Sequence, residues 1–306
     1  MDYHVPVMLP ECIDGLAIKP SGIYVDVTFG GGGHSKEILK HLTTGRLYSF
    51  DQDADAEAEA AKIDNPQFSF VRANFRHLKR YLRLHGVKQV DGILADLGVS
   101  SHQFDVPERG FSTRFNGPLD MRMDTESGRT AAEVLAEASE ASLHKIFGLY
   151  GEVKNARTLA QTVAVQRARA PFATIAEFKE AISGCMPRGK ENKYLAQVFQ
   201  ALRIEVNEEL AALEQMLEQA VEMLKPGGRL VVMSYHSLED RLVKSLIQKG
   251  KFEGEVEKDL FGNENKPLDA ITRKAITASE EEQQRNPRSR SAKLRVAEKR
   301  KPDAKK

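Results

Sequence analysis

The chain has 306 residues, of which 41% are hydrophobic and 29% charged, with a formal net charge of +1, so one large domain or two ordinary ones are expected. No apolar run is long enough to cross a bilayer, and the polar amino terminus lacks the form of a signal peptide, so we expect no membrane partner. Cys12 and Cys185 belong to no metal-spaced pair, which argues against a disulfide framework and favours a cytoplasmic location.

The first predicted strand, 23–28, leads into four consecutive glycines, Gly30 to Gly33, after which a helical pattern begins. A strand, a tight turn and a helix form the opening unit of a nucleotide-binding α/β sheet. The next predicted strand, 46–50, is followed by Asp51, about 20 residues after the glycine loop. This is the separation expected for an acid that binds ribose hydroxyls. The loop and the acid together predict a site for an adenosine-containing cofactor.

Two adenosine cofactors have to be distinguished at this loop. The dinucleotide fingerprint requires a third glycine, and the two possible registers place Ser35 or Lys36 there instead. An acid on the first strand, Asp26, followed by the glycine loop and Asp51, is more typical of an S-adenosylmethionine site. A nicotinamide-dependent oxidoreductase is the alternative, and a plain glycine turn is the less favoured structural interpretation.

The following segments alternate between strand and helix and then change character. Predicted strands at 68–71 and 91–96 continue a parallel βαβ arrangement. Residues 105–128 are polar and rich in Gly, Pro and Arg, which predicts a long ordered loop. Helical patterns follow, with no convincing strand among them, at 131–138, 142–149, 155–168, 175–185 and 194–204.

The sheet pattern returns after a further helix at 210–224, which carries one apolar stripe. Pro226-Gly227-Gly228 should end this helix, and a fifth strand is predicted at 230–234. The pattern therefore predicts a Rossmann-like α/β domain with an inserted all-helical domain. The expected parts are a first core part at 1–104, an inserted loop and helical substrate-recognition domain at 105–206, a second core part at 207–298 and a basic disordered tail at 299–306.

Basic residues gather at the carboxyl-terminal end. The segment 285–306 holds ten Lys or Arg against two acidic residues, a distribution typical of proteins that bind nucleic acid phosphates. For 301–306 a solvated, disordered terminus is the favoured interpretation. Upstream, 291–297 alternates apolar and basic residues, which predicts a closing strand with one charged face.

The carboxyl ends of the fourth and fifth strands should hold the chemistry, because open α/β sheets bind their ligands there. The fourth strand ends in Asp96, whose carboxylate can accept hydrogen bonds from a ligand or from the amides of the following turn. After the fifth strand, Ser237 and Asp240 have the spacing of a capping box. His236, in the same turn, is favoured as a hydrogen-bonding scaffold over a proton carrier. The acids and histidines show no paired ligand spacing, so no metal is expected.

Several motifs resemble those of the bacterial 16S ribosomal RNA cytosine-N4 methyltransferases, over nearly the whole chain from His4 to about Glu298. These motifs lie at 28–35, 96–101, 109–112, 117–124, 235–241 and 286–291. The run Gly-Pro-Leu-Asp-Met-Arg-Met-Asp at 117–124 is the most specific of them. The resemblance implies a class I methyltransferase core with a helical insert, S-adenosylmethionine as cofactor, and 16S rRNA of the small ribosomal subunit as partner. The sequence is compatible with a homodimer as well as with a monomer.

The resemblance also implies site residues, position by position. The implied cofactor contacts are Gly32, Gly33 and His34 in the loop, Asp51 at the ribose, Phe75 beside the adenine, Asp96 and Gln103. Asp96 is in addition the candidate catalytic residue, as acceptor for the cytidine N4 amine; the alternative, which we favour, leaves the amine to backbone carbonyls of the following turn. Departures from the family pattern at His102, Thr113, Asn116 and 192–195 concern substrate contacts more than the cofactor site.

The target base has to be flipped or single-stranded to reach such a site. Side chains of the 104–123 loop suit base stacking and phosphate binding, although Phe111 and Phe115 have the alternative role of anchoring the loop. The loop residues in question are Phe104, Arg109, Phe111, Arg114, Phe115 and Arg122. Basic residues of the insert, Arg167 and Arg169 among them, are either a solvated face or phosphate contacts. A non-catalytic RNA-binding assembly factor is the remaining alternative class.

Overall fold

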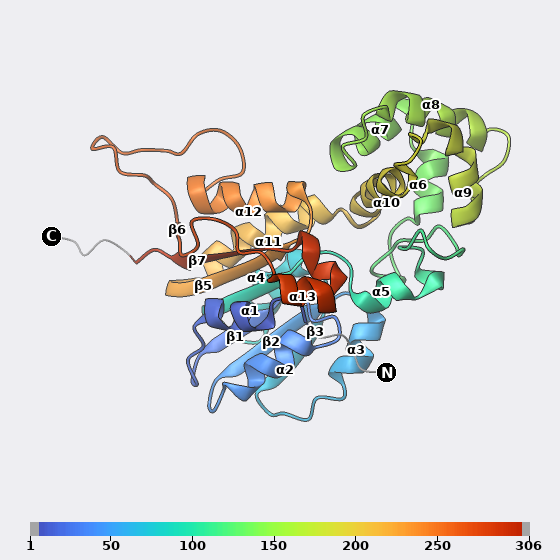
Figure 1. Ribbon diagram of the computed structural model, residues 1–306. Helices are drawn as coiled ribbons and strands as arrows, with labels where there is room; N and C mark the ends of the chain where they lie inside the picture. The colour runs from blue at the N-terminus through green and yellow to red at the C-terminus, as the bar shows by residue number, and fades with distance from the viewer. Residues whose placement is uncertain (1–5, 302–306) are drawn as a thin grey trace. The chain divides into compact units, whose positions relative to one another are not determined.

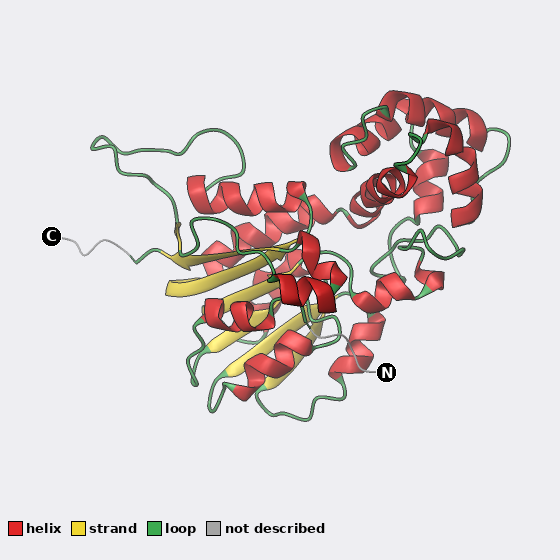
Figure 2. Cartoon of the chain, in the orientation of Figure 1, coloured by secondary structure: helices red, strands yellow, loops and turns green. Residues whose placement is uncertain are grey.

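The computed structural model describes residues 6–301, in which the strands form one sheet in the order β3-β2-β1-β4-β5-β7-β6. β1 to β5 run parallel, whereas β7 is antiparallel to both β5 and β6. Figure 2 shows these strands in yellow, surrounded by helices. The strands are β1 (Ile23–Asp26), β2 (Arg46–Asp51), β3 (Phe68–Arg72), β4 (Val90–Asp96), β5 (Leu224–Ser234), β6 (Leu268–Ala270) and β7 (Lys293–Lys299). The predicted Rossmann-like α/β sheet is confirmed.

The chain divides into two compact units, one formed by residues up to 98 together with those from 211 onward, and the other by 99–210. The sheet belongs to the first unit. Its helices are α1 (Leu9–Leu16), α2 (Gly33–Lys40), α3 (Ala54–Ala60), α4 (Leu78–Leu84), α11 (Glu209–Met223, whose first two residues belong to the second unit), α12 (Ser237–Lys249) and α13 (Glu280–Arg285).

Apolar side chains cover both faces of the sheet. One face packs on α4, α11 and α12 through residues such as Leu82, Leu217 and Leu246. The other face packs on α1 and α2 through Leu16 and Ile38. Figure 1 shows this division, with α11 and α12 over one face and α1 and α2 over the other. Because both faces are buried, the parallel strands read as nearly continuous apolar runs in the sequence.

The second unit is helical, and its core contains Phe147, Phe178 and Phe199. Capping boxes begin three of its helices, at Ser100 with Gln103, at Thr130 with Glu133 and at Thr174 with Glu177. Its helices are α5 (Ser101–Asp105), α6 (Ala131–Glu137), α7 (Glu140–Lys145), α8 (Ala156–Arg167), α9 (Ile175–Ala181) and α10 (Glu191–Asn207). α7 continues into a π-helix at Ile146–Tyr150, so the predicted helix at 142–149 changes its geometry midway.

The structure differs from the predicted strands and the predicted tail at three places. Pro226-Gly227-Gly228 lies inside β5, because the register shifts between Val90 and Gly92 of β4 and Gly227 adopts φ +81°. The short β6 was not predicted. The expected tail from 299 onward is also wrong at its start, since Lys299 ends β7 and Arg300 donates to Asp269 Oδ1 at 2.8 Å. Residues 302–306 of the expected tail lie outside the described residues.

Among the described residues, no helix is both long enough and apolar enough to cross a membrane.

Candidate functional site

The glycine loop joins β1 to α2 and has a fixed hydrogen-bonded geometry. Gly32 is the residue before α2, with φ +76°, and its N–H donates to Phe29 O at 2.7 Å. A Cβ at this position would lie 2.6 Å from the Phe29 ring, so only glycine fits without displacing that ring. Gly33 and His34 form the first turn of α2.

Asp51, the last residue of β2, holds the glycine loop against the neighbouring strand. Its Oδ2 accepts a hydrogen bond of 2.8 Å from Gly30 N, and its Oδ1 accepts one of 3.0 Å from Asp53 N. Burial raises the pKa of Asp51 to about 6, although the two backbone hydrogen bonds oppose this rise. Each carboxylate oxygen has a further lone pair, so Asp51 can still accept hydrogen bonds from ligand hydroxyls.

Asp26, at the end of β1, is used within the protein. Its Oδ2 accepts a hydrogen bond of 2.6 Å from Ser35 Oγ, and its Oδ1 accepts one of 3.1 Å from Thr28 N. Ser35 Oγ also lies 2.7 Å from Ser49 Oγ. This buried network fixes the start of α2 on β1 and β2, and it was not predicted from the sequence.

Asp96 lies at the end of β4 and is reached from three other elements. Tyr235, directly after β5, donates a hydrogen bond of 2.7 Å to Asp96 Oδ1, and Thr28 Oγ1 accepts one of 2.6 Å from Asp96 N. His34 Nδ1 is 3.9 Å from Asp96 Oδ2. The Asp96 side chain keeps 24% of its surface exposed.

Burial raises the pKa of Asp96 to about 6, while nearby His34 and the hydrogen bond from Tyr235 act in the opposite direction. Burial also raises the pKa of the Tyr235 phenol far above its ordinary value, with Asp96 adding to the shift, so this phenol is a neutral donor. The sequence analysis assigned no role to Tyr235, although this residue follows the predicted fifth strand and begins the motif at 235–241.

The remaining predicted cofactor contacts are Phe75 and Gln103. Phe75 opens the short helix η1 (Phe75–His77) after β3 and packs partly buried against the core of the first unit. Gln103 belongs to the second unit, where it forms a capping box with Ser100 at the start of α5. Its Oε1 accepts a hydrogen bond of 3.0 Å from Ser100 N.

His236 caps α12 and so has the hydrogen-bonding role favoured from the sequence, although the cap itself was predicted at Ser237. The capping box joins His236 to Glu239, and His236 Nε2 lies 3.1 Å from Glu239 Oε1. The predicted pair Ser237 and Asp240 is therefore wrong. Asp240 binds Arg295 of β7, with hydrogen bonds of 2.7 and 3.1 Å to its two carboxylate oxygens.

The loop at 105–128 is largely ordered by its own side chains, with η2 (Pro107–Arg109) as a single short helix among its described residues. Arg109 is buried and donates to the carbonyl oxygens of Arg122 and Met123 at 3.1 and 3.0 Å, and Phe111 is buried as well. These two side chains therefore build the loop, which was the alternative role considered for Phe111.

Other side chains of this loop remain accessible. The Arg114 guanidinium lies over the rings of Phe104 and Phe115, at 5.3 and 5.8 Å from their centroids. Phe115 is 40% exposed. Arrangements of this kind suit stacking on nucleic acid bases.

A cationic, adenosine-containing ligand fits the edge of the sheet in the first unit. The carboxylates Asp26, Asp51 and Asp96 end three adjacent strands, and burial raises the pKa of each. Such an excess of buried negative charge is relieved by a positive ligand or by hydroxyl donors, and it repels phosphate groups. The arrangement therefore fits a sulfonium cofactor better than a dinucleotide.

Known proteins of one family are similar to this chain over nearly its full length. The MraW methylase family matches residues 1–300. A protein of Cytophaga hutchinsonii named ribosomal RNA small subunit methyltransferase H is 60% identical, over 97% of this chain and 99% of its own. Proteins of the same name from Phocaeicola vulgatus and Flavobacterium johnsoniae are 57% and 56% identical, over 97% and 98% of this chain and 98% of each relative.

Proposed function

The chain belongs to the MraW methylase family, and from this premise we propose that it methylates the exocyclic N4 amine of a cytidine in 16S rRNA, at an edge of the sheet organised by Asp96. The enzyme is a methyltransferase of the small-subunit rRNA, and S-adenosylmethionine is its cofactor. The observation that carries the assignment to this edge is the Asp96 carboxylate, held by Tyr235 at the end of β4 beside the glycine loop.

The proposed cofactor residues are those implied by the family resemblance, and most of them lie in the first unit. We assign Gly32, Gly33 and His34 to the amino-acid portion of the cofactor, Asp51 to the ribose hydroxyls and Phe75 to the adenine. Asp96 completes this set, and Gln103 of the second unit is the additional proposed contact. When bound, S-adenosylmethionine supplies an electrophilic methyl group next to a positive sulfur.

The nucleophile defines what the protein has to provide. The N4 lone pair of cytosine is delocalised into the ring, so an acceptor must take hydrogen bonds from the amine and orient the nitrogen toward the methyl group. Asp96, partly exposed and anchored through one oxygen, is the proposed catalytic residue for this role. Backbone carbonyls of the turn that begins at Leu97 are the alternative acceptors. The sulfonium loses its charge on transfer, so no obligatory general acid is required.

The substrate must present an unstacked base, and the exposed side chains of the 104–115 segment are the proposed stacking contacts. Arg114 and Phe115 have the exposure and the geometry for this role, whereas Arg109 and Phe111 are committed to the loop itself.

We place the reaction in the cytoplasm. A homodimer is a further proposed state of the protein, to be tested by light scattering.

The proposal is tested by methyl transfer from labelled S-adenosylmethionine to 30S subunits that lack the modification, with naked 16S rRNA in parallel, followed by nucleoside mass spectrometry. N4-methylated cytidine formed by the wild type and not by Asp51→Ala would support both the reaction and the cofactor acid. A methyl group on another atom would contradict the assigned amine. Tight binding of S-adenosylhomocysteine and of RNA without any transfer would instead favour a non-catalytic assembly factor.

A further inference from the structure

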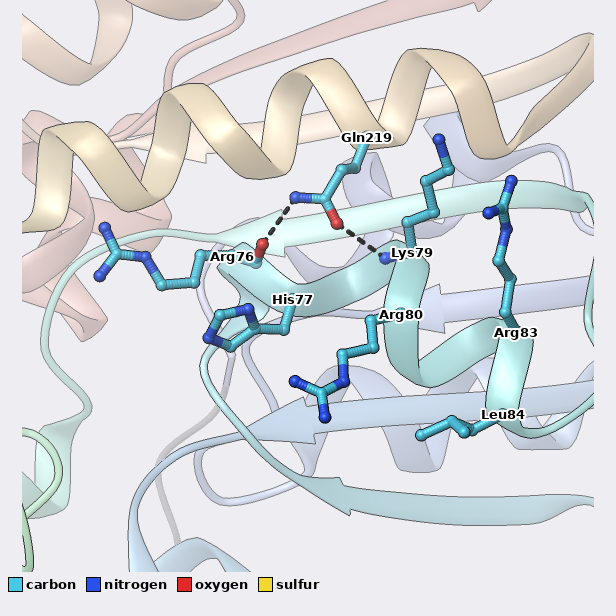
Figure 3. Close-up of a pocket in the computed structure, with 7 residues that line it drawn as sticks. All are labelled: Arg76, His77, Lys79, Arg80, Arg83, Leu84 and Gln219. Atoms are coloured by element: carbon cyan, nitrogen blue, oxygen red, sulfur yellow. Dashed lines mark hydrogen bonds between the residues drawn. The ribbon is translucent and has the colours of Figure 1, made fainter.

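A row of basic side chains lines an open groove of about 570 Å³ on the first unit, and none of the carboxylates described above lines it. The groove runs along η1 and α4 beside α11 (Figure 3). Its basic lining consists of Arg76, His77, Lys79, Arg80 and Arg83. None of these residues belongs to the proposed methyl-transfer site.

The spacing of apolar and basic residues along this segment places the basic side chains on the surface. Leu78 and Leu82 are fully buried and face the core, so α4 presents Arg80 and Arg83 on its exposed surface, and Arg76 precedes them in η1. The stretch 65–90 contains six Lys or Arg and no Asp or Glu.

Gln219 of α11 fixes the backbone that carries these side chains. Its Nε2 donates to Arg76 O at 2.6 Å, and its Oε1 accepts a hydrogen bond of 2.9 Å from Lys79 N. Both bonds are visible in Figure 3. The groove is therefore presented on a rigid support, and its ligand would be held by side chains rather than by free backbone amides.

The positive charge of the row is only partly compensated. Lys79 Nζ pairs with Glu222, and Arg76 is held by interactions that include a hydrogen bond of 2.9 Å from its Nε to Gln215 Oε1. Within residues 6–301, no carboxylate forms an ion pair with Arg80 or Arg83. Like charges at this helical spacing are mildly destabilising, so the fold gains nothing from keeping them together without a partner.

We propose that this groove binds phosphates of the ribosomal RNA outside the nucleotide that is methylated, an inference that rests on the proposed function. An open surface row of guanidinium groups suits a polynucleotide backbone, which is contacted along its length and carries one charge per nucleotide. η1 begins three residues after β3 ends, at the same edge of the sheet as Asp51 and Asp96, and α4 leads away from it. RNA flanking the target nucleotide therefore has a continuous positive path along α4.

The test compares Arg80→Gln/Arg83→Gln with Arg273→Gln/Lys274→Gln, an exposed pair elsewhere on the same unit that changes the charge equally. Methyl transfer to 30S subunits is measured at several salt concentrations. We expect KM for subunits to rise about tenfold in the Arg80/Arg83 variant, and the dependence of log(kcat/KM) on log salt to become shallower by about 1.4, or about 0.7 per lost contact with a single strand. The value of kcat, the affinity for S-adenosylhomocysteine and the thermal unfolding midpoint should match the control.

Arg80→Lys/Arg83→Lys retains the charge and should keep most of the salt dependence. Unchanged KM and salt dependence in the glutamine variant would overturn the proposal. Loss of subunit binding with full binding to naked 16S rRNA would also overturn it, and would assign the groove to an acidic protein of the subunit. Methyl transfer by the wild type tests the proposed function separately, and RNA affinity measured without turnover tests the groove even if no methyl group is transferred.

Discussion

The Tyr235 hydroxyl donates a hydrogen bond of 2.7 Å to Asp96 Oδ1 and so connects the turn after β5 to the last residue of β4. Asp96 thereby has one carboxylate oxygen fixed by the protein. The other oxygen lies 3.9 Å from His34 Nδ1, and the Asp96 side chain is 24% exposed. A carboxylate oriented in this way can point toward a ligand without a second charged partner. Tyr235 is accordingly a positioning residue for Asp96.

Tyr235→Phe should lower kcat/KM for methyl transfer by about tenfold, because a hydrogen bond to a charged group is lost. The same loss removes an influence that lowers the pKa of Asp96, so the pH midpoint of activity should move upward. Tyr24→Phe is the matched control, since its hydroxyl accepts a hydrogen bond from Lys19 N at the opposite end of the sheet. Equal activities and equal pH midpoints in the two variants would exclude the positioning role.

Binding of S-adenosylhomocysteine should strengthen as the pH rises from about 5 to 7 and then level off. Burial raises the pKa of both Asp51 and Asp96 to about 6 in the cofactor-free protein. Ligand hydroxyls and ammonium groups require the charged carboxylates, so below this pH binding must first release protons and affinity falls. Isothermal calorimetry near pH 6 in buffers of different ionisation enthalpy should detect this proton release. Affinity that does not depend on pH would mean that neither carboxylate contacts the ligand.

Much of the fold was predictable because each signal is local. The apolar runs that became β1, β2 and β4 are largely buried, and the glycines from Gly30 to Gly32 favour the turn that leads into α2. β6 was missed because it has three residues and is ordered by pairing with β7 rather than by its own pattern. Pro226-Gly227-Gly228 was misread because a bulge in β5 accommodates residues that usually end an element.

The candidate site was less predictable because its partners are distant in the sequence. The link from Tyr235 to Asp96 spans 139 positions and depends on β4 and β5 being neighbours. The cap of α12 was assigned to Ser237 because serine is the commoner capping residue, whereas His236 and Glu239 form it here. Burial, which raises the pKa of Asp51 and Asp96, also follows only from the assembled sheet.

Gly32→Ala should weaken cofactor binding and destabilise the protein more than Gly86→Ala does. Both glycines have a left-handed backbone, with φ +76° and +74°, so each alanine costs about 1 kcal/mol in backbone strain. A Cβ at Gly32 would in addition approach the Phe29 ring to 2.6 Å, whereas nothing lies within 4 Å of one at Gly86. Urea denaturation and titration with S-adenosylhomocysteine measure the two effects. Equal losses of stability and affinity in both variants would show that the Phe29 ring can move aside without affecting the loop.

Arg167→Ala should destabilise the helical unit by about 1–2 kcal/mol, although the sequence offered Arg167 as an RNA contact. Its Nη1 donates to the carbonyl oxygens of Leu135 and Ala138, both at 2.6 Å, and so satisfies the carboxyl end of α6. Arg169→Ala, on an exposed side chain two residues later, should leave stability unchanged. Hydrogen exchange of the α6 amides should increase only in the Arg167 variant, because it loses the bonds that hold the last turn. If exchange is unaltered while KM for 30S subunits rises, Arg167 serves the RNA instead of the helix.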